Sequence, residues 1–352
     1  MSKPDPKIKL AILYQAHKPP IFEGIIKPMK HGGYSDSGAD IAFALKDEIE
    51  IITPVGKAEE KSDIDWVFPD TAEGIQQALD KGATHFWLNT LLYEGHPAEP
   101  FMEGSNYWIG QVPALVGKHD DKHLTNEFLH EKGLPISRSL IFEKDTLDVK
   151  EKPPFPLVIK PIRGRGSKGV KVVENRNQFI RESLKLLESK RFGNKMMVES
   201  FLPGQEITIA LMPTGKYVIK GEEVVKNEIW NLPPLKRENH LKGIAPYSGI
   251  VPVSHNSFAL ENEELKDLNL KKIIESSKKL GQLLDIRAPI RIDARQNSEG
   301  KYFIFDVNFK PNMGGASRKH RKRQDSLVMI AARSMSWTYK DLLLNILRQA
   351  WK

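Results

Sequence analysis

The stretch IRIDARQNSEGKYFIFDVN, residues 290–308, carries polar side chains at regular spacing on two apolar segments. Side chains alternate between the two faces of a strand, so Arg291 and Asp293 share one face, as do Asp306 and Asn308. The polar turn between the segments predicts a β-hairpin. If the two strands are neighbours, three oxygen-bearing side chains and one guanidinium lie on a common face.

Oxygen ligands in that number are typical of Mg²⁺, which binds carboxylates together with substrate phosphates. We therefore predict a metal site made of Asp293, Asp306 and Asn308. The alternative is an exposed ion pair between Arg291 and one of the aspartates, a common contact that contributes about 0–1 kcal/mol. The spacing alone is compatible with both interpretations.

The composition is that of a globular protein. The chain has 352 residues, 40% of them hydrophobic and 28% charged, with no cysteine and a net charge of +8. This length predicts two or three packed units, and no apolar run approaches the ~20 residues that cross a bilayer. The N-terminus lacks the cleavage pattern of a signal peptide. The lack of cysteine excludes disulfides and thiolate metal sites and fits a reducing compartment. We therefore expect a cytoplasmic protein without membrane insertion. The positive charge suits an anionic ligand, either a nucleic acid or a small phosphorylated or carboxylated molecule.

The order of apolar segments predicts an α+β fold, that is, a mixed α/β fold. The chain is expected to begin with a small α/β unit. In that unit we expect a helix at 37–48, with a serine as candidate cap, and a parallel sheet. The strands expected for this sheet are 7–14, 49–54 and 84–90. Further along, the stretch 222–255 is rich in Pro, Gly and Asn and is predicted to be loop. The domains expected are 1–118, 119–198 and 199–352.

A glycine-rich loop lies in LVIKPIRGRGSKGVKVV, residues 157–173, where a buried strand delivers Lys160. Glycines allow backbone N–H groups to approach a phosphate closely, so the loop is a candidate phosphate site. A surface hairpin or a nucleic-acid contact is also compatible with it, and it is neither a Walker loop nor a dinucleotide fingerprint. The loop residues considered are Gly164, Gly166, Ser167 and Gly169.

A second candidate segment is MMVESFLPGQEITIAL, residues 196–211, in which Glu199 ends one strand and Glu206 opens the next. Between them, Phe201 and Leu202 could supply backbone hydrogen bonds and an apolar wall to a flat base, while the carboxylates accept from an amine and from hydroxyls. Taken alone, glutamates that flank a turn are more often simply solvated.

In this order the three motifs resemble the ATP-grasp fold with an N-terminal pre-ATP-grasp domain, and most closely its D-alanine–D-alanine ligase branch. The similarity spans about residues 86–350 and includes an Asp-Lys helix that ends in Gly-Leu-Pro. It implies a ligase that uses ATP and Mg²⁺ or Mn²⁺ to phosphorylate a carboxylate, which an amine then attacks. The implied partners are amino acids, with a homodimer common in this branch and no role for membrane or nucleic acid.

The resemblance also implies individual roles. Asp293, Asp306 and Asn308 match metal ligands, and Arg291 matches the arginine that steadies the transferred phosphoryl group, with Ser167 beside the γ-phosphate. The remaining residues matched to ATP contacts are Lys122, Lys160, Gly164, Gly166, Gly169, Glu199, Phe201, Leu202, Glu206 and Lys242.

Several positions depart from the family pattern. The stretch LAILYQAHKPPIFEG, residues 10–24, offers no turn of the family's Gly-Gly-x-Ser-x-Glu type, and Asn312 stands where the family has glycine. Counting forward from Asn308 places the family's carboxylate-binding serine at Ser317, whereas counting back from SLVMIAAR, residues 326–333, places it at Ser326. The two answers differ because a basic run is inserted between these serines. His96 lies where the family keeps a His-Gly loop near the substrate, although a lone histidine is more often structural.

The inserted basic run extends from Arg318 to Arg323 and allows three interpretations. It is a solvated loop, a nucleic-acid patch, or a set of arginines that grip the carboxylate of a substrate more acidic than alanine. The patch lacks the interleaved aromatic residues expected for base stacking. Beyond the ligase, the sequence also allows a phosphorylating enzyme with a non-amine acceptor, and a nucleotide-binding protein with a basic surface that has lost ligase chemistry.

Overall fold

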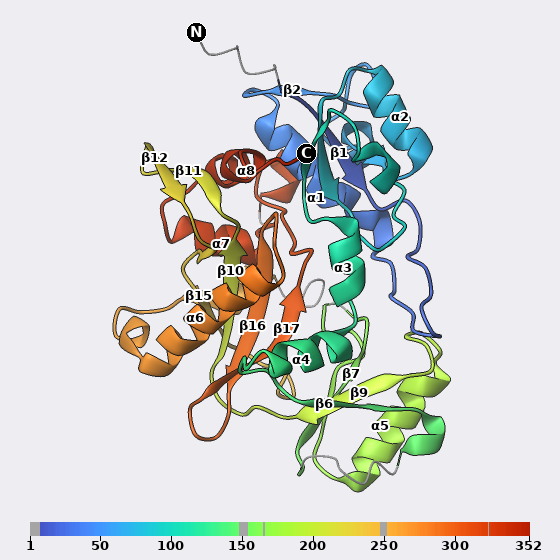
Figure 1. The fold of residues 1–352 in the computed structure, drawn as a ribbon, viewed down its shortest axis with the longest axis vertical. Coiled ribbons are helices and arrows are strands. Elements are labelled where there is room, and N and C mark those ends of the chain that lie inside the picture. Colours follow the sequence, from blue (N-terminus) through green and yellow to red (C-terminus); the bar gives the residue numbers. More distant parts are fainter. Residues whose placement is uncertain (1–7, 148–153, 165, 247–251, 323) are drawn as a thin grey trace.

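The computed structural model describes residues 8–147, 154–164, 166–246, 252–322 and 324–352. Three main sheets follow one another along the long axis of the molecule (Figure 1). Strand β1 (Lys9–Tyr14) lies at the top of the view, β16 (Ile290–Gln296) and β17 (Tyr302–Asn308) lie near the centre, and β7 (Leu157–Pro161) and β9 (Met196–Ser200) lie at the bottom. Within these ranges, no helix combines the length and apolar character that a membrane crossing requires.

The N-terminal sheet is parallel, as predicted, because apolar strands alternate with helices along the chain. Its central strand β1 pairs with β2, β3 and β4, and β4 pairs with β5. The predicted serine cap is wrong, because helix α1 begins after Tyr34, which has a left-handed backbone and makes no side-chain cap. The elements are β1 (Lys9–Tyr14), α1 (Ser35–Leu45), β2 (Glu50–Ile51), β3 (Phe68–Pro69), α2 (Ala72–Asp80), β4 (His85–Asn89) and β5 (Tyr107–Ile109).

The four-stranded sheet at the other end is antiparallel, in the order β6, β9, β7, β8. Helix α5 buries Phe179 and Leu187 against its apolar face. Two helices connect this sheet with the N-terminal unit, and Asp121 caps the second through the Leu124 N–H. The elements are α3 (Pro113–His119), α4 (Lys122–Glu131), β6 (Ser139–Phe142), β7 (Leu157–Pro161), β8 (Lys171–Val173), α5 (Arg176–Glu188) and β9 (Met196–Ser200).

The central sheet has the order β15, β14, β10, β16, β17, with β13 also paired to β10. Side chains alternate between the two faces of the sheet along β16. Ile290 and Ile292 therefore pack with α6, whereas Arg291 and Asp293 point to the other face. The loop predicted at 222–255 is wrong in part, because the described part of this stretch contains three strands, one of which, β12, forms a hairpin with β11. The elements are β10 (Glu206–Met212), β11 (Gly215–Ile219), β12 (Glu222–Lys226), β13 (Trp230–Asn231), β14 (Leu235–Arg237), β15 (Ser257–Ala259), α6 (Leu268–Leu283), β16 (Ile290–Gln296), β17 (Tyr302–Asn308), α7 (Leu327–Arg333) and α8 (Tyr339–Leu347).

A strap, residues 15–34, leaves the end of β1, reaches the four-stranded sheet and returns to α1, visible as the dark-blue loop that descends towards α5 in Figure 1. At its far point Ile25 packs with Ile162 and Met197. The Ile26 N–H donates to the Phe192 carbonyl at 3.1 Å. The strap therefore connects the two outer sheets across the central one.

Candidate active site

The predicted hairpin is present, and its polar side chains lie opposite one another. Asp293 on β16 is the register partner of Asp306 on β17, and Arg291 is the partner of Asn308. Asp293 is buried and accepts hydrogen bonds from Arg291 Nη2 at 2.8 Å and from Thr208 Oγ1 at 2.7 Å. The alternative of an exposed ion pair is wrong, because the Arg291–Asp293 pair lies inside the protein.

Lys122 at the start of α4 reaches this hairpin and forms an ion pair with Asp306. Burial opposes the charged form of each partner, but their mutual attraction prevails. It lowers the pKa of Asp306 and raises the pKa of Lys122. Lys122 and Asp306, from two different elements, therefore meet as charged groups beside Asp293.

A second buried pair lies on the four-stranded sheet, where Lys160 Nζ donates to Glu199 Oε1 at 2.7 Å and to the Phe305 carbonyl at 2.8 Å. Burial raises the pKa of Glu199, an effect that Lys160 opposes. Glu199 Oε2 and Glu206 Oε1 are buried without a hydrogen-bond partner among the described residues. Buried acceptors are normally paired, so these two oxygens are suited to donors of a ligand.

These groups line one cavity of about 290 Å³. Apolar side chains, among them Val158, Val172 and Leu202, lie beside the buried glutamates. A cleft with apolar walls and a few converging polar groups is the usual form of a small-molecule site. Of the residues predicted from the sequence, it is lined by Lys122, Lys160, Gly164, Gly166, Ser167, Glu199, Phe201, Leu202, Glu206, Arg291, Asp293, Asp306, Asn308, Asn312 and Ser326.

The glycine loop covers part of this cavity. Ser167 has a left-handed backbone with φ 54°, and its hydroxyl donates to the Ala245 carbonyl at 3.4 Å. Gly169 is not among the lining residues; a Cβ there would lie 2.6 Å from the Phe192 ring. Packing against this ring accounts for glycine at position 169, and a backbone contact between Gly169 and a phosphate stays a prediction.

Comparison with known proteins decides the family. The family model described as D-ala D-ala ligase C-terminus matches residues 132–348, more than half of the chain. The chain belongs to the D-alanine–D-alanine ligase family. It is an ATP-dependent ligase that forms a peptide bond between amino acids.

Individual relatives agree with this assignment. The D-alanine–D-alanine ligase of Aquifex aeolicus is 30% identical over 230 residues, which cover 64% of this chain and 68% of the relative. That of Zymomonas mobilis is 27% identical over 274 residues, 74% of this chain and 78% of the relative. The solved D-alanine–D-alanine ligase of Bacillus anthracis complexed with ATP shares the fold, with a TM-score of 0.63 at 18% identity over 98% of this chain and 97% of that chain.

The structure of the ligase adds pocket residues that sequence reasoning missed. Lys27, Lys30 and Tyr34 from the strap, and Lys310 after β17, all line the cavity. The available signal was the segment HGGYS, residues 31–35. This segment carries the Gly-Gly-x-Ser pattern of the family's turn, downstream of residues 10–24, the stretch in which we expected none.

The backbone of that turn explains its glycines. Gly33 has φ 55°, and its carbonyl accepts from the Gln15 N–H at 2.8 Å. A Cβ on Gly33 would lie 1.8 Å from the Gln15 carbonyl oxygen. Ser37 stands where the family turn carries glutamate, and it donates to the Tyr34 carbonyl at 3.1 Å.

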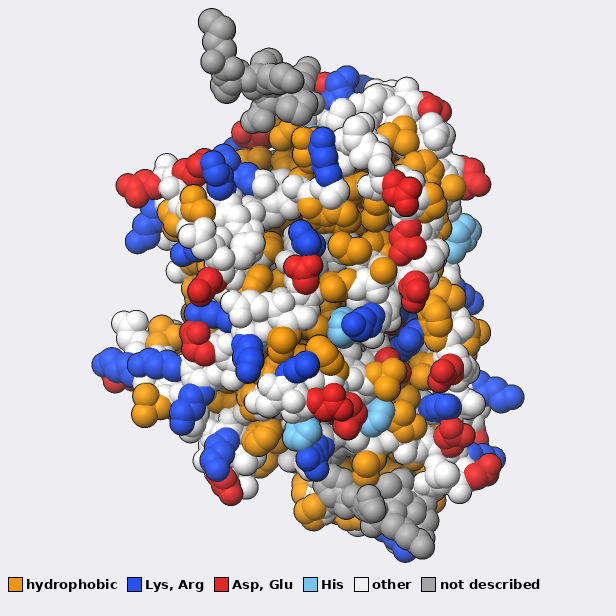
Figure 2. Space-filling model, in the orientation of Figure 1, with side chains coloured by type: hydrophobic (Ala, Val, Ile, Leu, Met, Phe, Trp, Pro, Cys, Tyr) orange, Lys and Arg blue, Asp and Glu red, His pale blue; other side chains and the backbone are white. Residues whose placement is uncertain are grey.

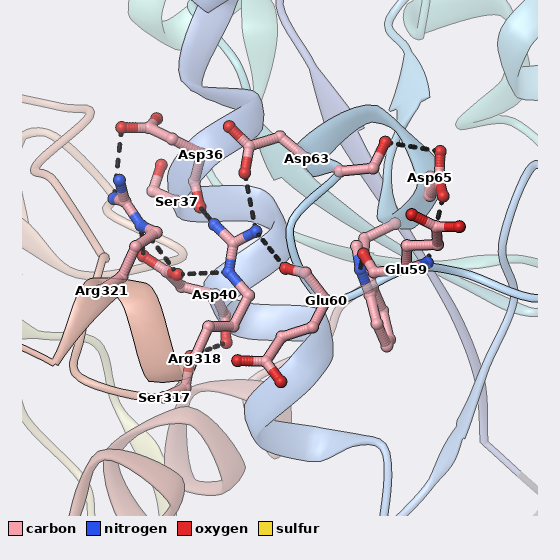
Figure 3. A network of polar contacts seen from close by, with 12 residues as sticks. Asp36, Ser37, Asp40, Glu59, Glu60, Asp63, Asp65, Ser317, Arg318 and Arg321 are labelled. Carbon is pink, nitrogen blue, oxygen red and sulfur yellow. Dashed lines mark hydrogen bonds and ion pairs between the residues drawn. The ribbon is translucent and has the colours of Figure 1, made fainter.

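The structure contradicts the prediction that Arg318 binds substrate or lies on a solvated loop. Its side chain is fully buried and donates to Asp40 Oδ1 at 2.9 Å and to Asp63 Oδ1 at 2.7 Å (Figure 3). Arg321 also pairs with Asp40, and Arg323 lies outside the described residues. Burying a guanidinium requires such partners, so Arg318 fastens the C-terminal segment to the N-terminal unit.

The two candidate serines, Ser317 and Ser326, differ in their position relative to the cavity. Ser317 is away from the cavity, and its hydroxyl donates to the Asp40 carbonyl at 3.0 Å. Ser326 lines the cavity and accepts from the Met329 N–H at 3.2 Å as the cap of α7. A hydroxyl that accepts one hydrogen bond still has its own proton to donate, so Ser326 can also contact a ligand.

Two further predicted residues lie outside the cavity lining. His96 is buried, with Nε2 at 3.2 Å from Asp70 Oδ2, which matches the structural interpretation of a lone histidine. Lys242 is exposed, although its neighbours Gly243 and Ile244 line the cavity. Neither side chain is placed to contact a ligand in this conformation.

Proposed function

We propose that the ligase activates the carboxylate of one amino acid by phosphorylation and joins it to the amine of a second. A carboxylate oxygen attacks the γ-phosphorus of ATP and displaces ADP. The amine then attacks the acyl carbon, the bond to phosphate breaks, and the amine loses a proton. The observation that carries the proposal is the facing arrangement of Asp293 and Asp306 with Arg291 and Asn308 across the hairpin.

The nucleotide is assigned to the end of the cavity beside the four-stranded sheet. There, the unpaired oxygens of Glu199 and Glu206 can accept from an exocyclic amine and from ribose hydroxyls, and Phe201 and Leu202 provide an apolar wall. Lys160 is held by Glu199 and can contact the phosphates through its remaining proton. The glycine loop with Ser167 would lie over the phosphates.

The donor set at the hairpin fits a divalent cation. Two carboxylates and an amide supply hard oxygens, and the aspartates occupy paired positions on adjacent strands. Among the described residues, no group of three histidine, aspartate or glutamate side chains could hold a metal ion by itself. The side-chain amide of Asn308 would therefore be the third protein ligand beside the two aspartates. Mg²⁺ or Mn²⁺ held by Asp293, Asp306 and Asn308 would neutralise phosphate charge during transfer.

Arg291 and Lys122 supply fixed positive charge beside these oxygens. Their guanidinium and ammonium groups are held by Asp293 and Asp306, so they are oriented before substrate binds. Charge that develops on the transferred phosphoryl group is stabilised by such preorganised donors. We accordingly assign transition-state stabilisation to Arg291 and phosphate positioning to Lys122.

The mechanism is tested by following oxygen from the substrate. The amino acid is labelled with ¹⁸O in its carboxylate, and the phosphate released with ADP is analysed by mass spectrometry. Transfer of one labelled oxygen to phosphate is expected, because the acyl phosphate retains a carboxylate oxygen on phosphorus when the amine attacks. Release of unlabelled phosphate would contradict an acyl phosphate.

Further assignments belong to the same proposal: a cytoplasmic enzyme, a homodimer, and three domains at 1–118, 119–198 and 199–352. The alternative function, a nucleotide-binding protein that has lost ligase chemistry, depends on the basic run that begins at Arg318 being a surface patch. Arg318 of that run is buried, and Figure 2 shows acidic and basic side chains interspersed over the visible face. These observations support the ligase over a charged docking surface.

A further inference from the structure

Glu206 lines the cavity, and one oxygen of its buried carboxylate is held by a histidine that comes from a neighbouring loop. His240 Nε2 donates to Glu206 Oε2 at 2.8 Å, and Arg295 Nη1 lies 3.7 Å from the same oxygen. Glu206 Oε1 is buried without a hydrogen-bond partner among the described residues. The carboxylate is thus fixed through one oxygen and able to accept through the other.

The strands place Glu206 on the same face of the central sheet as the proposed metal site. On β10, Thr208 follows Glu206 by two residues, and its hydroxyl donates to Asp293 at 2.7 Å. Glu206 is the register partner of Arg295, and Thr208 is that of Asp293, so all four side chains share one face. Glu206 therefore lies about 7 Å along the strand direction from the level of Asp293. Next to the triphosphate in ATP comes the ribose, whose two hydroxyl groups are donors for a carboxylate.

His240 is carried by a tight turn. Leu241 and Ile244 exchange backbone hydrogen bonds at 2.9 and 3.1 Å, and Lys242 and Gly243 between them have φ of 51° and 78°. Positive φ at both central residues is the geometry of a type I′ turn. The turn fixes the backbone of His240, the residue directly before it.

Three contacts hold this turn against the nucleotide end of the cavity. Arg295 Nη1 donates to the Gly243 carbonyl at 2.6 Å, and the guanidinium carbon lies 4.9 Å from the centroid of the Phe201 ring. A Cβ on Gly243 would lie 3.0 Å from the Phe201 ring, so the turn packs directly on this apolar wall. The Ala245 carbonyl accepts from the hydroxyl of Ser167 in the glycine loop at 3.4 Å. The turn therefore connects the apolar wall with the glycine loop.

We propose that His240 is a positioning residue for the nucleotide, which holds Glu206 Oε2 so that Oε1 accepts from the ribose hydroxyls of ATP. His240 is not among the described lining residues and acts through Glu206. Without this donor the carboxylate loses its fixed orientation, and a buried charge keeps fewer partners. The inference rests on the proposed function and adds the residue that sets its selectivity for a ribonucleotide.

The first test measures selectivity for the ribose without catalysis. ATP and 2′,3′-dideoxy-ATP, which lacks both hydroxyls, are titrated into the wild type with Mg²⁺ and no amino acid, and Kd is measured by calorimetry. ATP should bind about 10-fold or more tightly, because hydrogen bonds to a charged acceptor are lost in the dideoxy compound. Equal Kd values would overturn the inference.

Variants of His240 locate this selectivity. His240→Ala should reduce the preference for ATP to about 3-fold or less, mainly through weaker binding of ATP. His240→Gln should restore most of it, because the side-chain amide can donate to the same oxygen. His255→Ala is the matched control, since His255 is exposed and its contact with Asn239 uses the backbone carbonyl, which the substitution retains. A wild-type preference in His240→Ala would refute the role of His240.

Two further measurements separate positioning from a general loss of structure. His240→Ala should raise the KM for ATP with kcat nearly unchanged, because Glu206 is assigned to the ribose and not to the transferred phosphate. In a Glu206→Ala background, adding His240→Ala should leave the preference for ATP unchanged. An equal fall in both backgrounds would show that His240 does not act through Glu206. If His240→Ala fails to fold, His240→Met removes the donor, retains more of the side-chain volume and takes its place in each assay.

Failure of the ligase reaction gives a different pattern. If no pair of amino acids yields ADP, the proposed function is contradicted, while the calorimetric comparison of ATP with dideoxy-ATP still tests His240. If amino-acid pairs yield ADP but the two nucleotides bind equally, the ligase stands and the inference fails.

Discussion

At the level of single residues, Arg318 joins two distant parts of the chain. Its guanidinium is fully buried and donates to Asp40 and Asp63, which lie more than 250 positions away in the sequence. Nothing near the basic run in the sequence indicates these partners, because they are brought to Arg318 only by the fold.

Arg318 should contribute strongly to stability. Replacing it with methionine removes the guanidinium that bonds Asp40 and Asp63, and the free energy of unfolding should fall by about 3 kcal/mol, measured by urea denaturation. Arg333→Met is the control, because Arg333 pairs with Asp325 at an exposed site and should change stability by about 0–1 kcal/mol. Equal effects of the two variants would show that the buried network does not hold the domains together.

At the scale of elements, the hairpin and the strap mark the limits of sequence reasoning. The β16–β17 hairpin was predictable, since its period of two and its turn are both local signals. The strap was not, because its proline-rich sequence lacks periodicity and its contacts are with the distant β7–β9 region. The same absence of periodicity explains why the strands within 222–255 were expected to be loop.

The strap should detach when its apolar anchor is removed. Ile25 is buried against Ile162 and Met197, so Ile25→Ala should expose residues 15–34 to limited proteolysis and raise the KM for ATP, because the strap contacts the sheet that carries the nucleotide residues. Ile21→Ala provides the control, since Ile21 is 63% exposed. If both variants resist trypsin as the wild type does, the strap is not anchored through Ile25.

At the scale of the whole molecule, burial of histidines links stability to pH. Burial lowers the pKa of His85 on β4 and, together with Lys118, that of His119 on α3 below the ordinary value of 6.5. The unfolded chain therefore binds more protons than the folded one between the folded and unfolded pKa values. The contribution of the two neutral histidines to the free energy of unfolding is fully present above pH 6.5. It is lost as the pH falls from 6.5 through the lower pKa values of the folded state.

The pH effect is testable with two substitutions. The free energy of unfolding should fall as pH is lowered from 7.5 to about 5, and the double variant His85→Gln and His119→Gln should show a shallower dependence, because neither site then takes up a proton on unfolding. Urea denaturation at a series of pH values measures the slope. A double variant that retains the wild-type slope would assign the acid sensitivity to other groups.

The facing aspartates of the β16–β17 hairpin are expected to support ATP-dependent ligation. The most direct measurement is ADP formation with ATP, Mg²⁺ and pooled amino acids, by the wild type, by Asp293→Asn and Asp306→Asn, and by Asp285→Asn as an exposed control. We expect amino-acid-dependent ADP formation by the wild type and the control, and a loss of about 100-fold or more in both hairpin variants. Wild-type rates in the hairpin variants would contradict the account.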